Sequence, residues 1–334
     1  MKKILITGTA GFIGFHLAKT LLENDYKVHG YDGMTRYYDV NLKFARHKIL
    51  FKYPNFSATE GLLEDYNKLE EMSKKFEPDI IIHLAAQAGV RYSLENPRAY
   101  IDSNIVGTFN VMEIARKQKV EHLLMASTSS VYGANLNMPF TEQEKTDTQL
   151  TIYAATKKAN ENMAHSYSHL WKIPITMFRF FTVYGPWGRP DMALFKFVSS
   201  ILNNKQIDIY NNGDMARDFT YVSDLVNGIK LLIGVIPSVD KKSSVLDSLS
   251  PIGPFRVVNI GNSEKIKLLD FIKAIEENLG KKAIRNYMPM QKGDVPETWA
   301  NASLLNKLTG YTPKTNFKDG IDHFIKWYRE YYNE

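Results

Sequence analysis

The sequence contains no cysteine among its 334 residues. Disulfide bonds and cysteine-ligated metal sites are therefore excluded, and we expect no bound metal. The composition is compatible with a reducing cytoplasm, which is the location that we predict. The sequence also has no apolar run that approaches the ~20 residues needed to cross a bilayer, so we expect no membrane partner.

The sequence has no block of like charges. Lys and Arg number 42 against 36 for Asp and Glu, which gives a formal net charge of +6 at pH 7. The basic residues are scattered and mixed with acids, whereas nucleic-acid-binding proteins gather them in a patch or stripe. A small anionic substrate explains the excess as well, and we expect no nucleic-acid partner.

Three glycines stand near the N-terminus at a regular spacing, Gly8, Gly11 and Gly14. The apolar segment Lys2–Thr7 precedes them, and apolar residues at helical spacing follow, which predicts a strand, a tight turn and a helix. Such a turn lets backbone N–H groups and the positive end of the helix dipole approach a pyrophosphate. In isolation the same spacing is also found in a simple strand-to-helix turn.

A second predicted strand, 27–31, ends at Asp32, roughly 20 residues after the glycines. A carboxylate at that point binds the hydroxyls of an adenosine ribose, and its charge favours NAD over NADP. Arg36 lies close enough along the chain to soften that preference. The strand, the helix and Asp32 together favour a dinucleotide site over a simple turn.

Strand and helix patterns alternate along the first half of the chain, which predicts a parallel, doubly wound sheet. Beyond 185–190 the regularity fades, and we expect a smaller substrate-binding lobe. We place the domains at 1–181 and 182–334, with some later segments crossing back, and expect an insertion or mobile loop from Pro237 to Pro254. Further strands are predicted at 79–83, 122–126 and 174–181, and helices at 97–119 and 152–171.

Tyr153 and Lys157 stand four residues apart at the start of a predicted helix, so both side chains lie on one face. An ammonium group beside a tyrosine favours the phenolate and lowers the pKa of the tyrosine from about 10 toward neutrality. The phenolate then serves as a general base. Such a pair also arises by chance on helix surfaces, but its place downstream of the glycines favours catalysis.

Several segments, in this order and spacing, resemble the extended short-chain dehydrogenases/reductases, and among them the nucleotide-sugar epimerases of the UDP-glucuronate 4-epimerase type. The resemblance covers nearly the whole chain and implies a Rossmann-type α/β fold with a smaller mixed α/β C-terminal lobe. The segments are His83–Ser93, Ser127–Gly133, Tyr153–Lys157, Arg179–Asp191, Arg217–Tyr221 and Gly293–Pro296.

The resemblance implies a reaction at C4 of a UDP-sugar with tightly bound NAD. Tyr153 takes the proton of the 4-hydroxyl while hydride leaves C4, Thr128 hydrogen-bonds the same oxygen, and Lys157 also holds the nicotinamide ribose. The 4-keto sugar then turns over in the site and receives the hydride on its other face. The expected products interconvert UDP-glucuronate and UDP-galacturonate, and the cofactor is regenerated in every turnover.

Three hydroxyl side chains indicate which reaction and which substrate of that family to expect. Ser129 and Ser130 occupy the places where 4,6-dehydratases normally carry an Asp-Glu pair, and decarboxylases usually carry Glu at the second place, so epimerisation is the chemistry left. Thr182 stands where galactose-type epimerases usually have Asn, which leaves room for a C6 carboxylate. We expect Ser129, Ser130, Thr182 and Arg91 to receive that carboxylate; ordinary hydrogen bonding, or an acid partner for Arg91, is the alternative.

The resemblance assigns further contacts and a partner. Arg217 binds the diphosphate, Gln291 and Asp294 lie near the uridine, and Arg189 lines the same cleft. Leu62 replaces an Asp that usually binds adenine, which predicts weaker adenine recognition. The expected cofactor-binding residues are Gly8, Gly11, Phe12, Ile13, Gly14, Asp32, Leu84, Ala85, Ala86, Tyr153 and Lys157.

Three alternatives stay open. The helices predicted at 97–119 and 152–171 resemble the pair through which this family forms a homodimer with a four-helix bundle, although their apolar residues also suit an internal core. The substrate is alternatively a neutral sugar, as in UDP-glucose or UDP-N-acetylhexosamine 4-epimerases. A non-catalytic NAD-binding sensor is the third possibility, against which the intact Thr128, Tyr153 and Lys157 argue.

Overall fold

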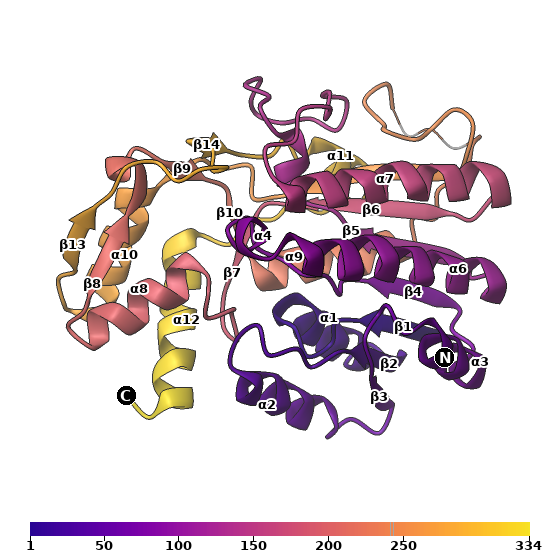
Figure 1. Ribbon diagram of the computed structural model, residues 1–334, viewed down its shortest axis with the longest axis horizontal. Helices are drawn as coiled ribbons and strands as arrows, with labels where there is room; N and C mark the ends of the chain where they lie inside the picture. The colour runs from indigo at the N-terminus through magenta and orange to yellow at the C-terminus, as the bar shows by residue number, and fades with distance from the viewer. Residues whose placement is uncertain (241, 243) are drawn as a thin grey trace.

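A seven-stranded parallel sheet forms the centre of the molecule (Figure 1). The computed structural model describes residues 1–240, 242 and 244–334. The strand order is β11-β6-β5-β4-β1-β2-β3, so the winding reverses between β1 and β4, and the predicted doubly wound sheet is confirmed. The strands are β1 (Lys3–Thr7), β2 (Lys27–Asp32), β3 (Phe56–Glu60), β4 (Ile80–His83), β5 (His122–Ala126), β6 (Ile175–Phe180) and β11 (Phe255–Ile260).

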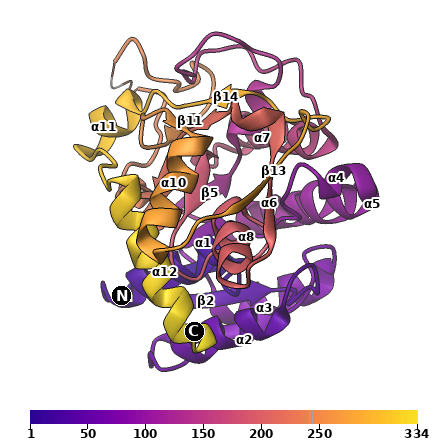
Figure 2. The same cartoon turned by 90° about the vertical axis from the view of Figure 1, so that its left-hand side faces the viewer.

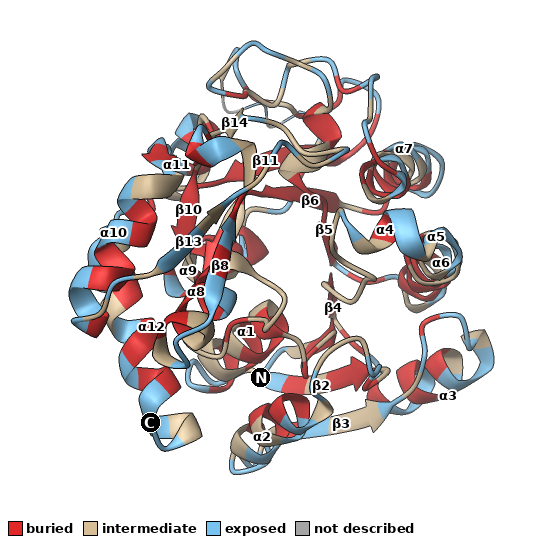
Figure 3. Cartoon of the chain, turned by 60° about the vertical axis from the view of Figure 1, so that its left-hand side comes forward, coloured by how far each residue is buried: buried red, intermediate tan, exposed pale blue. Residues whose placement is uncertain are grey.

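Helices cover both faces of this sheet, which explains why its strands read as nearly continuous apolar runs. Ile4 and Ile6 of β1 pack toward one face with α1 and α9, whereas Leu5 between them packs toward the other with α3, α6 and α7. Figure 3 shows the buried strands between these layers. The helices are α1 (Phe12–Leu22), α2 (Val40–Leu50), α3 (Tyr66–Phe76), α6 (Thr108–Gln118), α7 (Ile152–Trp171) and α9 (Val222–Ile233).

A smaller mixed α/β lobe faces the carboxyl ends of the strands (Figures 1 and 2). It has an apolar core of its own, in which Phe219 and Phe271 stack with ring centroids 3.9 Å apart. Its elements are β7 (Thr182–Tyr184), α8 (Ala193–Leu202), β8 (Gln206–Ile209), β9 (Ala216–Arg217), β10 (Phe219–Tyr221), β12 (Ile266–Lys267), α10 (Leu268–Leu279), β13 (Ile284–Tyr287), β14 (Glu297–Thr298) and α12 (Phe317–Tyr332).

Three segments from the second half of the chain belong to the main sheet and its helical layers. Strand β11 pairs with β6, with Asn259 opposite Arg179, α9 packs beside α1, and α11 (Ser303–Thr309) packs against α9 and β11. The main sheet and its helices therefore include residues from both sides of the predicted boundary at 181/182. Of the loop expected from Pro237 to Pro254, residues 241 and 243 lie outside the described residues.

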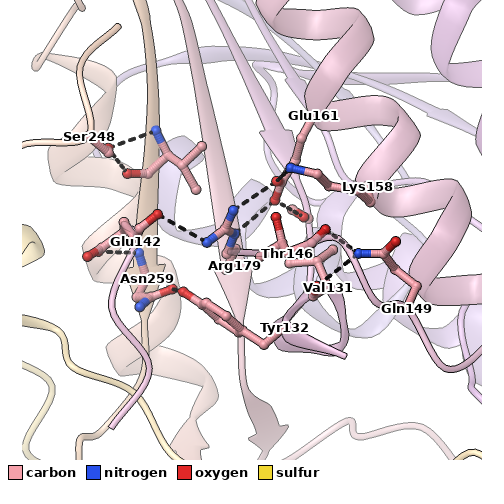
Figure 4. A network of polar contacts seen from close by, with 12 residues as sticks. Val131, Tyr132, Glu142, Thr146, Gln149, Lys158, Glu161, Arg179, Ser248 and Asn259 are labelled. Carbon is pink, nitrogen blue, oxygen red and sulfur yellow. Dashed lines mark hydrogen bonds and ion pairs between the residues drawn. The ribbon is translucent and has the colours of Figure 1, made fainter. Parts of the chain in front are cut away.

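The outer edge of β11 bonds to side chains and to a loop. Val257 N donates to Ser248 Oγ at 3.1 Å, Asn259 N donates to Glu142 Oε1 at 2.8 Å, and Ser250 N donates to Phe255 O at 2.9 Å. Figure 4 shows Ser248, Glu142 and Asn259 side by side along this strand. These partners satisfy edge groups that a neighbouring strand would otherwise occupy.

The segment predicted as one helix at 97–119 is divided in the structure. It consists of α5 (Pro97–Tyr100), the π-helical turn η1 (Ile101–Gly107) and α6, and a short helix α4 (Tyr92–Glu95) precedes it. The wider turn places Asn104 against Gln87, whose N–H and C=O it bonds at 2.8 and 3.0 Å. A long-range contact therefore reshapes this helix, as is common for π-turns near functional sites. No helix in the described part of the chain is long and apolar enough to span a membrane.

Candidate active site

A cavity of about 970 Å³ lies at the carboxyl ends of the main-sheet strands, where the C-terminal lobe faces them. Its wall includes residues at or just beyond the ends of β1, β2, β4 and β5, and residues from β9 and the segment before β14. In doubly wound sheets this edge, near the reversal of the strand order, is where ligands bind. The lining includes Gly8, Gly11, Phe12, Ile13, Gly14, Asp32, Leu84, Ala85, Ala86, Tyr153 and Lys157.

The glycine turn is built for close backbone contact. Gly8 has a φ of +85°, and a Cβ at Gly14 would lie 2.0 Å from the carbonyl oxygen of Gly8. Helix α1 starts after Gly11, which offers no side chain to cap the first N–H groups of the helix in the described structure. The exposed amides and the helix dipole thus fit an anionic group such as a pyrophosphate.

Asp32 is buried at the end of β2, and backbone amides hold its carboxylate. Oδ2 accepts from Ala10 N and Oδ1 from Met34 N, both at 2.9 Å. Arg36 is exposed and is not among the described residues that line the cavity. The geometry therefore gives no support to the idea that Arg36 weakens the preference for NAD over NADP. Leu62 does line the cavity, and its effect on adenine recognition stays a prediction.

Thr128, Tyr153 and Lys157 meet in the cavity wall. Helix α7 begins with Thr151, whose Oγ1 accepts from Ala154 N at 3.2 Å, and this cap fixes the turn that carries Tyr153. Lys157 is buried, and its Nζ donates to Ala126 O at 2.9 Å. The predicted set from β5 and α7 is therefore assembled at one point.

The pKa of Tyr153 differs in direction from the expectation. Burial raises it, although a hydrogen bond with Thr128 and the positive charge of Arg189 act to lower it. Burial also lowers the pKa of Lys157 to about 8. The four-residue spacing brings both side chains to the cavity wall, but desolvation of the two buried groups is the largest cause of both pKa shifts.

The shifted pKa of Lys157 predicts a pH-dependent stability difference. Its ordinary pKa of 10.5 falls to about 8 on folding, which costs about 3 kcal/mol at about 1.36 kcal/mol per pKa unit. Lys157→Met removes that cost. Because the unfolded wild type binds more protons than the folded form between pH 8 and 10.5, wild-type stability rises there. The stability difference between Lys157→Met and wild type, measured by urea titration of NAD-free protein, should fall from pH 7 to pH 10; a constant difference would refute the assignment.

A buried ion pair supports the residue before Thr128. Ser127 Oγ donates to Glu161 Oε1 at 2.7 Å, and Arg179 holds both oxygens of Glu161 at 2.9 Å (Figure 4). Burial raises the pKa of Glu161, but the charge and hydrogen bonds of Arg179 outweigh it and hold the pKa below the usual range. Glu161 lies one turn beyond Lys157 on α7 and so ties the end of β5 to the catalytic helix.

Most of the predicted substrate residues line the same cavity. Arg217 Nη2 donates to Asp294 Oδ1 at 2.8 Å, and Arg189 Nε donates to Asp191 Oδ1 at 3.0 Å. These pairs orient the two guanidinium groups. The predicted substrate residues in the lining are Ser129, Ser130, Thr182, Arg189, Arg217 and Asp294.

Arg91 and Gln291 are not among the described residues that line the cavity. Arg91 is exposed and lies over the ring of Tyr210, 4.5 Å from its centroid, so an aromatic ring rather than an acid is its partner. Gln291 buries an Oε1 atom that has no hydrogen-bond partner among the described residues. Their roles in substrate binding stay predictions.

Sequence reasoning missed several lining residues. Tyr37 follows β2, and its hydroxyl donates to Asp191 Oδ2 at 3.3 Å across the cavity. Lys43 on α2 lines the wall near Asp32. Tyr100 is not among the described lining residues, but it is buried with its ring edge-on to the lining residue Tyr153, at a centroid distance of 6.0 Å. The local signal in the sequence was the adjacent pair Tyr37 and Tyr38, which follows the acid-terminated strand after a turn of four residues.

Comparisons with known proteins identify the family of this chain. Residues 4–245 match the profile of the NAD dependent epimerase/dehydratase family. A probable UDP-glucuronate 4-epimerase from Rhizobium meliloti is 53% identical over 333 residues, covering 99% of this chain and 98% of that protein. Protein CapI from Staphylococcus aureus is 51% identical, covering 99% and 100%. The crystal structure of UDP-glucuronic acid 4-epimerase from Bacillus cereus, in complex with UDP-glucuronic acid and NAD, has a TM-score of 0.89 at 32% identity, covering 99% and 100%.

Proposed function

Because the chain belongs to the NAD dependent epimerase/dehydratase family, we propose that it is a UDP-glucuronate 4-epimerase with NAD as its resident cofactor. The observation that carries the proposal is the shared wall of one cavity, in which Thr128, Tyr153 and Lys157 stand beside Ser129 and Ser130. The first three supply proton transfer at a sugar hydroxyl, and the two serines supply hydrogen bonds without an acid or base for elimination. The named relatives support the same substrate.

The chain's own residues account for the proton transfers. Tyr153 removes the proton of the 4-hydroxyl and later returns it, Thr128 hydrogen-bonds the reacting oxygen, and Lys157 supplies positive charge beside them. NAD, when bound, accepts hydride from C4 and gives it back on the other face of the ring. The glycine turn and Asp32 would hold its pyrophosphate and adenosine ribose, and Lys157 its nicotinamide ribose.

The hydroxyl groups near C6 protect the substrate from decarboxylation. A 4-keto uronic acid is a β-keto acid, and carbon dioxide leaves only when the carboxylate charge flows into an enolate. Ser129, Ser130 and Thr182 line the cavity, and hydrogen bonds from their hydroxyl groups would keep the charge on the carboxylate. The same three side chains therefore select a uronate and oppose its loss of carbon dioxide.

The decisive experiment is incubation of the purified protein with UDP-glucuronate, without added cofactor, followed by separation of the nucleotide sugars and measurement of carbon dioxide. We expect UDP-galacturonate without carbon dioxide or a UDP-pentose. Formation of the pentose would overturn the role of the serines. Turnover of neutral UDP-sugars alone would favour the alternative substrates. Epimerisation that appears only when NAD is added would indicate weak adenine binding at Leu62.

Thr182 is the position that tests substrate selection. Thr182→Asn removes the hydroxyl donor and fills the space for the C6 carboxylate, so turnover of UDP-glucuronate should fall about 10- to 100-fold, the loss expected for a hydrogen bond to a charged group. Thr182→Ser keeps the donor and is the matched control. Steady-state kinetics on UDP-glucuronate and UDP-glucose provide the measurement, and equal losses on both sugars would refute the assignment.

We further propose a homodimer built from η1 and α6 of each subunit together with α7. Apolar residues stand exposed along these helices, including Ile101, Val106 and Phe109, the last at 45%. Exposed apolar residues on adjacent helices are typical of a helical interface. In the described structure α6 and α7 lie side by side, as half of a four-helix bundle requires (Figure 3).

A cytoplasmic location stays a prediction.

The interface has a direct test. Phe109→Lys introduces a charge at the centre of the proposed bundle and should convert the dimer to a monomer, because an unpaired buried ammonium costs several kcal/mol. Phe44→Lys changes a phenylalanine on α2 that is 53% exposed, somewhat more than Phe109, and is the control. Sedimentation equilibrium gives the masses, and a dimeric Phe109→Lys protein, or a monomeric wild type, would exclude the arrangement.

A further inference from the structure

Lys43 is a buried cation in the wall of the cavity. It lies in the first turns of α2, its exposed fraction is 5%, and it lines the cavity together with Asp32 and Thr35. A lysine is rarely buried to this extent without a partner of opposite charge in contact. Such a position calls for an explanation other than packing.

The acceptors that contact the ammonium group are uncharged. Lys43 Nζ donates to Thr35 O at 2.8 Å and to Thr35 Oγ1 at 3.1 Å. An ammonium group has three N–H donors, so one is left over. Burial lowers the pKa of Lys43 while the charge of Asp32 opposes that change, which places the carboxylate within electrostatic range. The ring of Tyr38 also faces the ammonium group, with its centroid 4.8 Å from Nζ. Two neutral acceptors and one aromatic ring still leave the buried charge without an opposite charge in contact and one N–H without an acceptor.

Asp32 retains accepting capacity on both oxygens. An ionised carboxylate offers about four acceptor positions, two on each oxygen. Ala10 N occupies one position on Oδ2 and Met34 N one on Oδ1. One position on each oxygen is therefore open, and both belong to a side chain that lines the cavity.

These two residues together form a donor–acceptor pair for a vicinal diol. The two hydroxyl protons of a diol need two acceptors, which the carboxylate of Asp32 offers, and a diol oxygen can accept from the remaining N–H of the ammonium. We propose that Lys43 is a cofactor-selecting residue that donates to the adenosine ribose diol of NAD in concert with Asp32. The inference rests on the proposed NAD cofactor and adds a contact that sequence reasoning missed.

The competing explanation is that Lys43 only braces the loop that carries Thr35. Bracing and direct contact differ in one measurable respect. A residue that touches a ribose hydroxyl loses its effect when that hydroxyl is deleted from the ligand, whereas a brace affects binding of every ligand equally. A cycle of protein and ligand deletions therefore separates the two roles.

The experiment measures dissociation constants of NAD, 2′-deoxy-NAD and 3′-deoxy-NAD by calorimetry on cofactor-stripped protein. Lys43→Met is compared with Lys48→Met, which removes an exposed lysine from the same helix. We expect Lys43→Met to weaken NAD binding about 10- to 100-fold and to weaken binding of at least one deoxy analogue far less. Lys48→Met should behave as wild type.

Two outcomes would overturn the inference. Equal weakening for NAD and both analogues would identify Lys43 as a brace, and unchanged NAD binding would remove it from the site. If Lys43→Met does not fold, Lys43→Gln, which retains a neutral donor, is measured against the same criteria. If the wild-type protein does not bind NAD at all, that result would instead refute the proposed function itself, and the inference with it.

Discussion

Replacement of Tyr153 by phenylalanine should lower the rate of UDP-glucuronate epimerisation by about 10³-fold while the protein keeps its fold and its NAD. Phenylalanine retains the ring that packs edge-on to Tyr100 but cannot accept the proton of the 4-hydroxyl. A positioned general base contributes about 10²- to 10⁴-fold, and here the same group also returns the proton in the second half-reaction. The loss should fall on kcat, because the hydroxyl acts on the reacting oxygen rather than on the uridine end.

Tyr92→Phe provides the control for this result. Tyr92 belongs to α4, packs against Tyr100, and is not among the described residues that line the cavity. Its rate should match that of wild type. A Tyr153→Phe protein that retains a tenth or more of the wild-type rate would show that another group takes the proton, and Thr128 would be the first candidate.

Removal of one partner of the buried Arg179–Glu161 pair should cost about 3–5 kcal/mol of folding stability. Both side chains are buried, and the two hydrogen bonds between them are 2.9 Å long. Arg179→Met leaves a carboxylate in the interior with only Ser127 and the more distant Lys158 as partners. Thermal and urea unfolding should therefore occur at a markedly lower midpoint than in wild type.

The free-energy cost of the unpaired charge can be separated from the cost of lost packing. The double variant Arg179→Met with Glu161→Leu carries no unpaired charge, and it should recover much of the stability that the single variant loses. Lys75→Met removes an exposed pair with Glu71 and should change stability by less than about 1 kcal/mol. A single Arg179→Met variant as stable as Lys75→Met would contradict the buried pair.

The parts of the fold that could be predicted from sequence are those encoded by neighbouring residues. The glycine turn and Asp32 lie within one strand–helix–strand unit, so spacing alone places them at the same edge of the sheet. Tyr153 and Lys157 are neighbours on one helix. In each case the contact depends on residues close in sequence, and the structure brings these residues to the cavity as expected.

The contacts that could not be predicted join residues distant in sequence. Glu161 and Arg179 meet only when α7 packs on β6, and Tyr37 reaches Asp191 across 154 positions of the chain. The division of the 97–119 helix follows from the bond between Asn104 and Gln87, and no helical propensity signals it. The pKa of Tyr153 depends on total burial, which a four-residue spacing does not reveal.

The hydrogen-bonded outer edge of β11 affects how separate molecules can associate. An unprotected edge strand is a template onto which another chain can add a strand, and long exposed edges promote aggregation. Ser248, Ser250 and Glu142 already occupy backbone groups of Phe255, Val257 and Asn259. Strand addition at this edge would first have to displace these partners. At the β11 edge of the sheet, these hydrogen bonds therefore oppose edge-to-edge pairing with another molecule.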